Sequence, residues 1–213
     1  MNSKASGKIV SKKYTPQLIE LFVDSTEIGR RSFNKIELAD YKLADSNYVV
    51  LKFYSKQNSK WVLKNDFRLS KDSIHLCDPE ISDFNNDGQN DFTFVSAVAA
   101  RLSNAIRTLF IYDKENDRLI HIRNSQDYPN MLYNKKLNCI DAFIFSSCTE
   151  TAFLKLEKDT LREFASVEQC DSLTVTIYDK KGNGKVIMKK KGNRDDFIRY
   201  DSYSPLKKYH DNP

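Results

Sequence analysis

Oxygen-bearing side chains crowd into one short stretch of the sequence, between positions 83 and 91. Counted from Asp83, they stand at positions 1, 3, 5 and 9, and Gly88 at position 6 permits a sharp turn. Calcium takes six to eight oxygen ligands, and alternating positions of a tight loop supply them. The pattern predicts a Ca²⁺ site that also uses the backbone carbonyl of residue 89. The predicted ligands are Asp83, Asn85, Asp87, Gln89 and Asp91.

A solvated turn is the alternative interpretation of this loop. Asp and Asn side chains form such turns by accepting hydrogen bonds from their own backbone. The loop also departs from an EF-hand, because Phe94 stands where that motif has glutamate and the residues around it resemble a strand. Without a cation the neighbouring carboxylates would repel one another, and we expect the loop to be mobile.

Catalytic chemistry has little support in the spacing of reactive residues. The chain carries no sequence motif of serine hydrolases, zinc peptidases or phosphate-binding loops, so we do not expect an enzyme. The three histidines are scattered and no two cysteines form a C-x-x-C pair. The spacing therefore does not predict a structural zinc site.

The four cysteines, Cys77, Cys139, Cys148 and Cys170, allow two disulfides in an oxidising compartment. Three connectivities are open, and four buried thiols in a cytosolic protein are the alternative. Cys148 and Cys170 flank a predicted hairpin, and a bond between them would close that loop.

A long loop at 124–134 is the candidate for contact with a partner protein. It carries Tyr128, Met131 and Tyr133, and such side chains are favoured where a protein fills the cleft of another. The alternative is that the two tyrosines cover a hydrophobic edge of the fold.

The charge and composition of the chain restrict its partners and its compartment. The net charge is +5, but the lysines of 179–194 resemble an exposed hairpin, so we expect no nucleic acid partner. No apolar run is long enough for a transmembrane segment, and no signal peptide is visible. We expect a flexible leader at 1–20, which could follow a removed export or lipoprotein signal. A single β domain is expected at 21–213.

Strand patterns dominate the chain from residue 47 onward, as short apolar runs joined by polar turns. Only 15–25 and 96–105 have a composition that could also form helices. We predict an all-β fold, a propeller-like array of short antiparallel strands, with a β-sandwich as the alternative. The segment 199–210 is expected to be a strand that closes the ring, because closure removes an open edge.

Part of the chain resembles a family of bacterial envelope proteins. The layout of "DFNNDGQNDF", "LFIYDKENDRLIHI", "NSQDYPNMLYNKKLNCI" and "AFLKLEKDTLREF" covers roughly 78–190 and is similar to calcium-loop (FG-GAP-like) β-propellers that serve as periplasmic lysozyme inhibitors and immunity proteins. By this resemblance the metal ligands are Asp83, Asn85, Asp87 and Asp91. The N-terminal third of the chain has no counterpart in the resemblance.

The resemblance implies an exported, periplasmic or cell-envelope protein that binds Ca²⁺ and inhibits a partner. That partner would be a peptidoglycan-degrading enzyme or a cell-wall-degrading toxin. The alternative is a structural surface or lipoprotein module, in which calcium stabilises a scaffold and no enzyme is inhibited.

Overall fold

The computed structural model describes residues 15–44, 46–72 and 75–209, and it is built almost entirely of antiparallel strands. The first sheet has the order β1-β2-β3-β4, with strands at Gln17–Asp24, Asn34–Leu43, Ser46–Gln57 and Lys60–Lys71. The second has the order β5-β6-β7-β8, at Glu80–Ser82, Asp91–Ala99, Asn104–Asp113 and Arg118–His121.

The third sheet is the largest and has six strands in the order β14-β13-β12-β11-β10-β9. From β9 to β14 these are Leu132–Asn134, Cys139–Phe145, Thr149–Glu157, Thr160–Gln169, Ser172–Tyr178 and Gly184–Lys191. A two-stranded hairpin, β15 (Tyr200–Tyr203) and β16 (Leu206–Lys208), follows it. The two helical turns are short 3₁₀ segments, η1 (Ala100–Leu102) and η2 (Ser125–Asp127).

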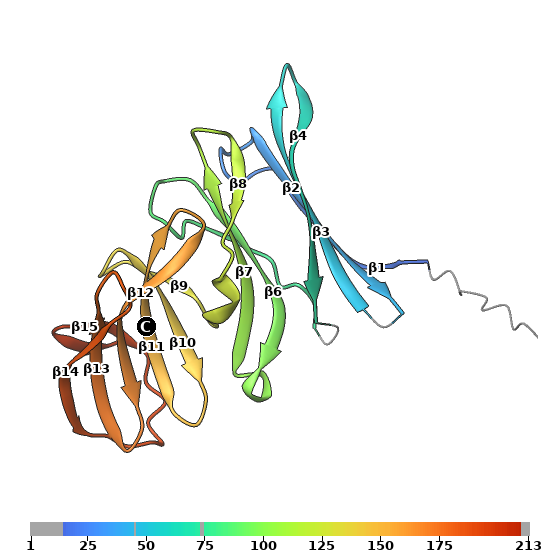
Figure 1. Cartoon of the computed structure of the whole chain (residues 1–213). Coiled ribbons are helices and arrows are strands. Elements are labelled where there is room, and N and C mark those ends of the chain that lie inside the picture. The colour runs from blue at the N-terminus through green and yellow to red at the C-terminus, as the bar shows by residue number, and fades with distance from the viewer. Residues whose placement is uncertain (1–14, 45, 73–74, 210–213) are drawn as a thin grey trace, which may run out of the picture.

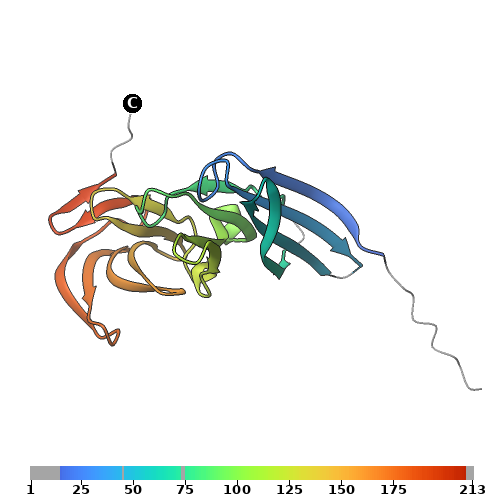
Figure 2. The ribbon, with the colours of Figure 1, turned by 90° about the horizontal axis from the view of Figure 1, so that it is seen from above.

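The sheets stack face to face in an open series. In Figures 1 and 2 the first and third sheets lie at opposite ends, with the second sheet between them. One apolar core lies between the first and second sheets and contains Leu51, Phe53, Phe92 and Phe110. Another lies between the second and third sheets, so the second sheet is covered on both faces. The third core joins the third sheet to the C-terminal hairpin.

The alternation of side chains explains why these segments form strands. In β2 every second residue from Asn34 to Asp40 is buried, which is the pattern of a strand with one face on a core. In β6 the run from Asp91 to Ser96 is buried without alternation, because neighbouring sheets cover both of its faces.

The all-β prediction is confirmed, and both segments with ambiguous composition are mainly extended. The first forms β1, and the second forms the end of β6, the turn η1 and the start of β7. None of the sheets in the described residues closes on itself or joins the others in a ring, so a propeller is not confirmed. The face-to-face packing is consistent with the β-sandwich alternative.

The prediction that 199–210 closes a ring is wrong for the part that the structure describes. This segment forms its own hairpin, β15 and β16, which packs against the third sheet. The buried carboxylate of Asp141 holds it there by accepting hydrogen bonds from Arg199 Nε (2.7 Å) and the Tyr209 hydroxyl (2.6 Å). The Asn134 amide donates a third hydrogen bond to Asp141, over 2.8 Å. Buried polar contacts therefore fix the hairpin on the sheet.

The boundary predicted for the flexible leader is partly wrong. Strand β1 begins at Gln17, within the segment 1–20, where its backbone pairs antiparallel with β2. Residues 1–14 lie outside the described part of the chain. Of the helices in the described residues, none has the length and apolar character needed to cross a membrane.

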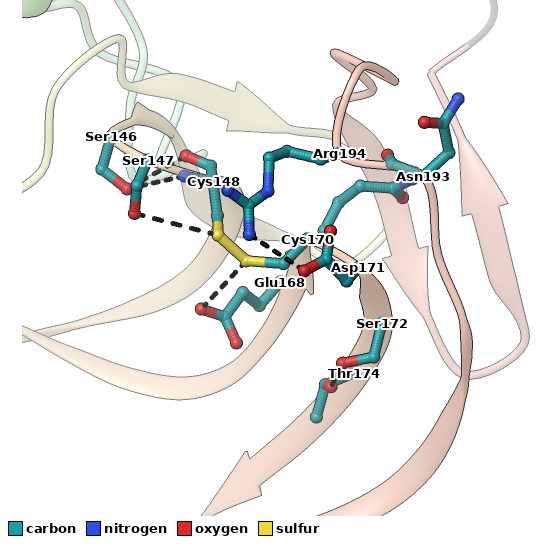
Figure 3. The surroundings of a disulfide bond; sticks show 11 residues. Ser146, Ser147, Cys148, Glu168, Cys170, Asp171, Ser172, Thr174, Asn193 and Arg194 are labelled. Atoms are coloured by element: carbon teal, nitrogen blue, oxygen red, sulfur yellow. Dashed lines mark hydrogen bonds and ion pairs between the residues drawn. A yellow bond between two sulfur atoms is a disulfide. The ribbon is translucent and has the colours of Figure 1, made fainter.

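One disulfide is present, between Cys148 and Cys170. It joins the residue just before β11 to the residue just after β12. Figure 3 shows Arg194 and Asp171 beside it, and these two residues form an ion pair at 3.0 Å. Cys77 and Cys139 are buried free thiols, so the second disulfide that the even count allowed does not form.

Candidate metal centre

The acidic loop is the hairpin connection between β5 and β6. Its first predicted ligand, Asp83, follows the last residue of β5, and its last, Asp91, is the first residue of β6. Between them Phe84 is buried in the core that the second and third sheets share. The loop therefore starts and ends on paired strands, and a core side chain anchors it close to its start.

Backbone N–H groups of the loop point at its own side-chain oxygens. Asp83 accepts from the N–H of Asp87 (3.2 Å) and of Gly88 (2.9 Å). Asn85 Oδ1 accepts from the N–H of Asp87 at 3.1 Å, and Asp87 Oδ1 accepts from the N–H of Gln89 at 2.9 Å. These are the contacts of Asx turns. Gly88 has φ +83°, the left-handed conformation that the sixth position was expected to need.

Asp91 is the buried member of the set and is 0% exposed. Its Oδ2 accepts from the N–H of Phe84 and its Oδ1 from the N–H of Tyr112, both at 2.8 Å. Burial raises the pKa of the Asp91 carboxyl to about 8; the two N–H donors oppose that shift, and the negative charges of Asp83 and Asp87 add to it. A divalent cation among these carboxylates would offset both unfavourable effects.

The residues fit calcium in the type, number and order of their oxygen donors. The carboxylate oxygens of these residues do not, however, lie close together. In the described part of the chain, two groups of three acidic, His or Cys side chains bring ligand atoms within 4.8 Å of one another, and the loop acids are not among them. Asp83 and Asp87 would therefore have to move toward Asp91 to share one ion.

The loop between β1 and β2 of the first sheet contacts the acidic loop. Gly29 and Asn90 form an isolated antiparallel bridge, with the Gly29 N–H donating to the Asn90 carbonyl at 2.9 Å. The Asn90 side chain donates to the carbonyl of Glu27 at 3.0 Å. Gly29 has φ +55°, and a Cβ there would lie 2.8 Å from Asn34 Oδ1. A side chain at position 29 would therefore clash with Asn34 of β2.

The three predicted partner-binding residues lie in different environments. Met131 is 1% exposed and fills the core between the second and third sheets, so its assignment to a partner surface is wrong. Tyr128 is half-buried and packs against the same core. Tyr133 is half-buried, and its hydroxyl donates to Asn138 Oδ1 at 2.7 Å.

Tyr133 also lines a surface hollow of about 300 Å³ that reaches the acidic loop. Phe84 and Asn85 form one side of this hollow, and strands β10 and β11 contribute Ile140 and Leu156. The structure thus brings one predicted calcium ligand and one predicted partner-binding residue to the same depression. This proximity could not be predicted from the sequence, since Asn85 and Tyr133 are far apart in the chain.

A pair of glutamates in the third sheet was not anticipated from the sequence. Burial, together with the negative charge of Glu150, raises the pKa of Glu163 to about 7. Glu163 Oε1 is a buried oxygen without a hydrogen-bond partner among the described residues. Such groups are expensive to ionise, and only the fold brings these two together.

Comparison with known proteins gives a likeness in structure and none in sequence. The chain matches no protein-family model, and no curated protein matches it in sequence. A solved structure of a Xanthomonas type IV secretion system related protein has a similar fold, with a TM-score of 0.51 and 10% sequence identity. The likeness covers 82% of this chain and 99% of that one. At this level of identity it establishes a shared fold.

Proposed function

We propose that the protein is a calcium-binding β protein of the bacterial periplasm or cell envelope that binds and inhibits a peptidoglycan-degrading enzyme. The observation that carries the proposal is the acidic loop, in which Asp83, Asn85 and Asp87 and the buried Asp91 follow one another between β5 and β6. A loop of this composition between two strands supports a structural role for Ca²⁺ next to a surface that binds a partner.

Within the loop, the side chains of Asp83, Asn85, Asp87 and Asp91 and the carbonyl of Gln89 would hold the ion. Bound Ca²⁺ would supply positive charge that removes the repulsion between the carboxylates. The residues themselves would then fix the backbone of the loop between β5 and β6. Because Phe84 and Asn85 belong to the same loop, the wall of the hollow would be fixed with it.

The hollow beside the loop is the candidate contact surface. Tyr133 lines it, and tyrosine contributes a large contact area at a low cost in conformational entropy. A projecting side chain or loop of the target enzyme would enter between Tyr133 and Asn85. The secretion system related neighbour supports a place in the cell envelope, where enzymes that cleave peptidoglycan act.

The test is an inhibition assay with the purified full chain in calcium-containing buffer. Muramidases and related cell-wall hydrolases, including toxins encoded beside the gene, are assayed on purified peptidoglycan with increasing amounts of the protein. We expect stoichiometric inhibition of at least one enzyme, and the same enzyme should co-elute with the protein in size-exclusion chromatography. Calcium-dependent stability without inhibition of any enzyme would overturn the proposal in favour of the structural module.

A further inference from the structure

A second group of potential metal ligands, distinct from the acidic loop, involves the edge strand of the first sheet. Glu20 of β1, Asp40 of β2 and Cys77 of the segment between β4 and β5 place one ligand atom each within 4.8 Å of the others. Asp40 and Cys77 are fully buried, and Glu20 is half-buried. Three separate stretches of the chain therefore meet at one polar point inside an apolar core.

Asp40 leaves one of its oxygens without a partner. Its Oδ2 pairs with Lys71 Nζ at 3.2 Å, and both side chains are 2% exposed. The remaining contacts of Lys71 Nζ are to the backbone carbonyls of Asp72 and His75. Asp40 Oδ1 is buried and has no hydrogen-bond partner within the described residues. An unsatisfied buried carboxylate oxygen is costly, and a bound cation would satisfy it.

The pairing of the strands adds to this cost. Glu20 and Asp40 stand directly opposite each other in the antiparallel ladder of β1 and β2. Like charges at such positions destabilise a sheet. The register shifts between Leu18 and Glu20, as it does at a β-bulge, and bulges re-aim side chains toward sites. Glu20 Oε2 also accepts a 2.7 Å hydrogen bond from the Cys77 N–H, so the carboxylate is held beside the thiol.

We propose that Glu20, Asp40 and Cys77 bind a zinc-class divalent cation. The charges of the group support this assignment. Two carboxylates and the Lys71 ammonium leave one net negative charge in the buried group. Binding of Zn²⁺ with release of the thiol proton to solvent adds one cation of charge two and one thiolate, and the sum becomes zero. A neutral buried cluster is far less costly than a charged one.

The thiol selects the class of metal. Calcium and magnesium bind oxygen ligands, whereas zinc binds thiolate sulfur together with carboxylate oxygen. Zinc bonds of about 2.0–2.3 Å are within reach of ligand atoms already gathered this closely. Because the ligands come from β1, β2 and the segment after β4, the ion would tie the edge strand β1 to the connection that leads into the second sheet.

Metal titration of the full chain tests the site directly. The apo protein is titrated with Co²⁺, which reports thiolate ligation by a charge-transfer absorption band, and then with Zn²⁺ in competition. We expect one equivalent of Co²⁺ to produce the band and Zn²⁺ to remove it. The variant Cys77→Ser should lose the band. The matched control is Cys139→Ser, which removes the other buried free thiol and should keep it.

A second variant covers the case in which Cys77→Ser does not fold. Glu20→Gln changes a half-buried residue and should weaken Zn²⁺ binding by about tenfold or more, while circular dichroism shows an intact fold. Asp87→Asn in the acidic loop should leave Zn²⁺ binding unchanged, which separates this site from the calcium loop. Absence of the Co²⁺ band in the folded protein, or a band that Glu20→Gln leaves at full affinity, would overturn the proposal.

Discussion

The backbone N–H of Tyr112 donates a 2.8 Å hydrogen bond to Oδ1 of Asp91, and this contact ties the acidic loop to the central strand β7. The Tyr112 side chain lies in the core between the first and second sheets. Its hydroxyl donates a hydrogen bond to Asp117 Oδ1 at 2.9 Å. Asp117 also forms an ion pair with Arg30 at 2.9 Å. Arg30 follows Gly29 in the loop that contacts Asn90. One tyrosine therefore links the candidate calcium loop to the contact between the first two sheets.

Asp87→Ala should remove the calcium dependence of stability. A site occupied at about 100 times its dissociation constant stabilises the fold by roughly 2.7 kcal/mol, so chelation should lower the thermal midpoint of the unaltered protein by several degrees. The variant should melt at one temperature with or without Ca²⁺ in differential scanning fluorimetry.

The matched control is Asp179→Ala. Asp179 forms a similar turn, accepting from the N–H groups of Lys181 (2.8 Å) and Asn183 (2.9 Å), but its hairpin lacks the later acidic ligands. This variant should respond to Ca²⁺ as the unaltered protein does. An unaltered protein that melts identically in chelator and in calcium would make the loop an ordinary turn.

Tyr133→Ala should weaken inhibition of the target enzyme by about tenfold or more, which corresponds to a loss of ~1.4 kcal/mol of binding free energy. Titration calorimetry with the enzyme identified in the inhibition assay would measure it. The control is Tyr48→Ala, which removes a half-buried tyrosine from the first sheet, where it stacks on Tyr41 at 5.3 Å. Equal affinities for both variants would place the contact surface elsewhere.

The double variant Cys148→Ser/Cys170→Ser should be less stable by about 3 kcal/mol, the chain-entropy cost of opening a loop with a sequence separation of 22. Urea unfolding with and without reductant would show the difference. Reductant should destabilise the unaltered protein by a similar amount and leave the double variant unaffected. A reductant effect on the double variant would point to a contribution from elsewhere in the chain.

Glu163→Gln should stabilise the protein at alkaline pH and leave it unchanged in acid. Burial raises the pKa of Glu163 from 4.5 to about 7, so the folded state holds a proton that the unfolded state releases. The favourable contribution is complete below pH 4.5 and is lost as the pH rises through 7. Full conversion of this shift would give roughly 3.4 kcal/mol at pH 8, and because Glu163 is partly exposed and screened by solvent we expect a smaller difference between variant and unaltered protein. Glu168→Gln, an exposed change on the same strand, should not alter the pH profile.

Asp141→Ala should release the C-terminal hairpin from the third sheet. The substitution removes the shared acceptor of Arg199, Tyr209 and Asn134 and leaves a partly buried guanidinium without its charge partner. Breaking a buried pair in this way costs roughly 3–5 kcal/mol. Limited proteolysis should cut the variant near residue 199, whereas the unaltered chain should resist cleavage there.

The strands were predictable because their apolar residues recur with the period of a sheet. β3 alternates clearly and was predicted. β2 alternates as well but was missed, because the polar residues Asn34 and Asp40 occupy two of its buried positions. The ambiguous segment 15–25 became an edge strand because β2 offered it a partner, an interaction that local composition does not contain. The propeller interpretation arose from the spacing of strands, which is the same in stacked open sheets.

The two candidate metal sites also differ in whether the sequence alone could reveal them. The order of oxygen donors in 83–91 is a local pattern and could be recognised along the chain. Glu20, Asp40 and Cys77 are separated by long stretches, and only strand pairing and the packing of two sheets bring them together. Met131 was misassigned because an apolar residue in a long loop has the same sequence signature whether it faces a partner or a core.

Both faces of the central sheet are apolar, and neither could remain exposed to water. Its strands β6 and β7 are covered by the first sheet on one side and by the third on the other. Loss of either neighbouring sheet would expose a layer of Phe and Leu side chains to solvent. The three sheets should therefore unfold together in one cooperative transition. The amide protons of β6 should accordingly be the slowest of the chain to exchange with deuterium, and a fragment that keeps only two of the layers should aggregate.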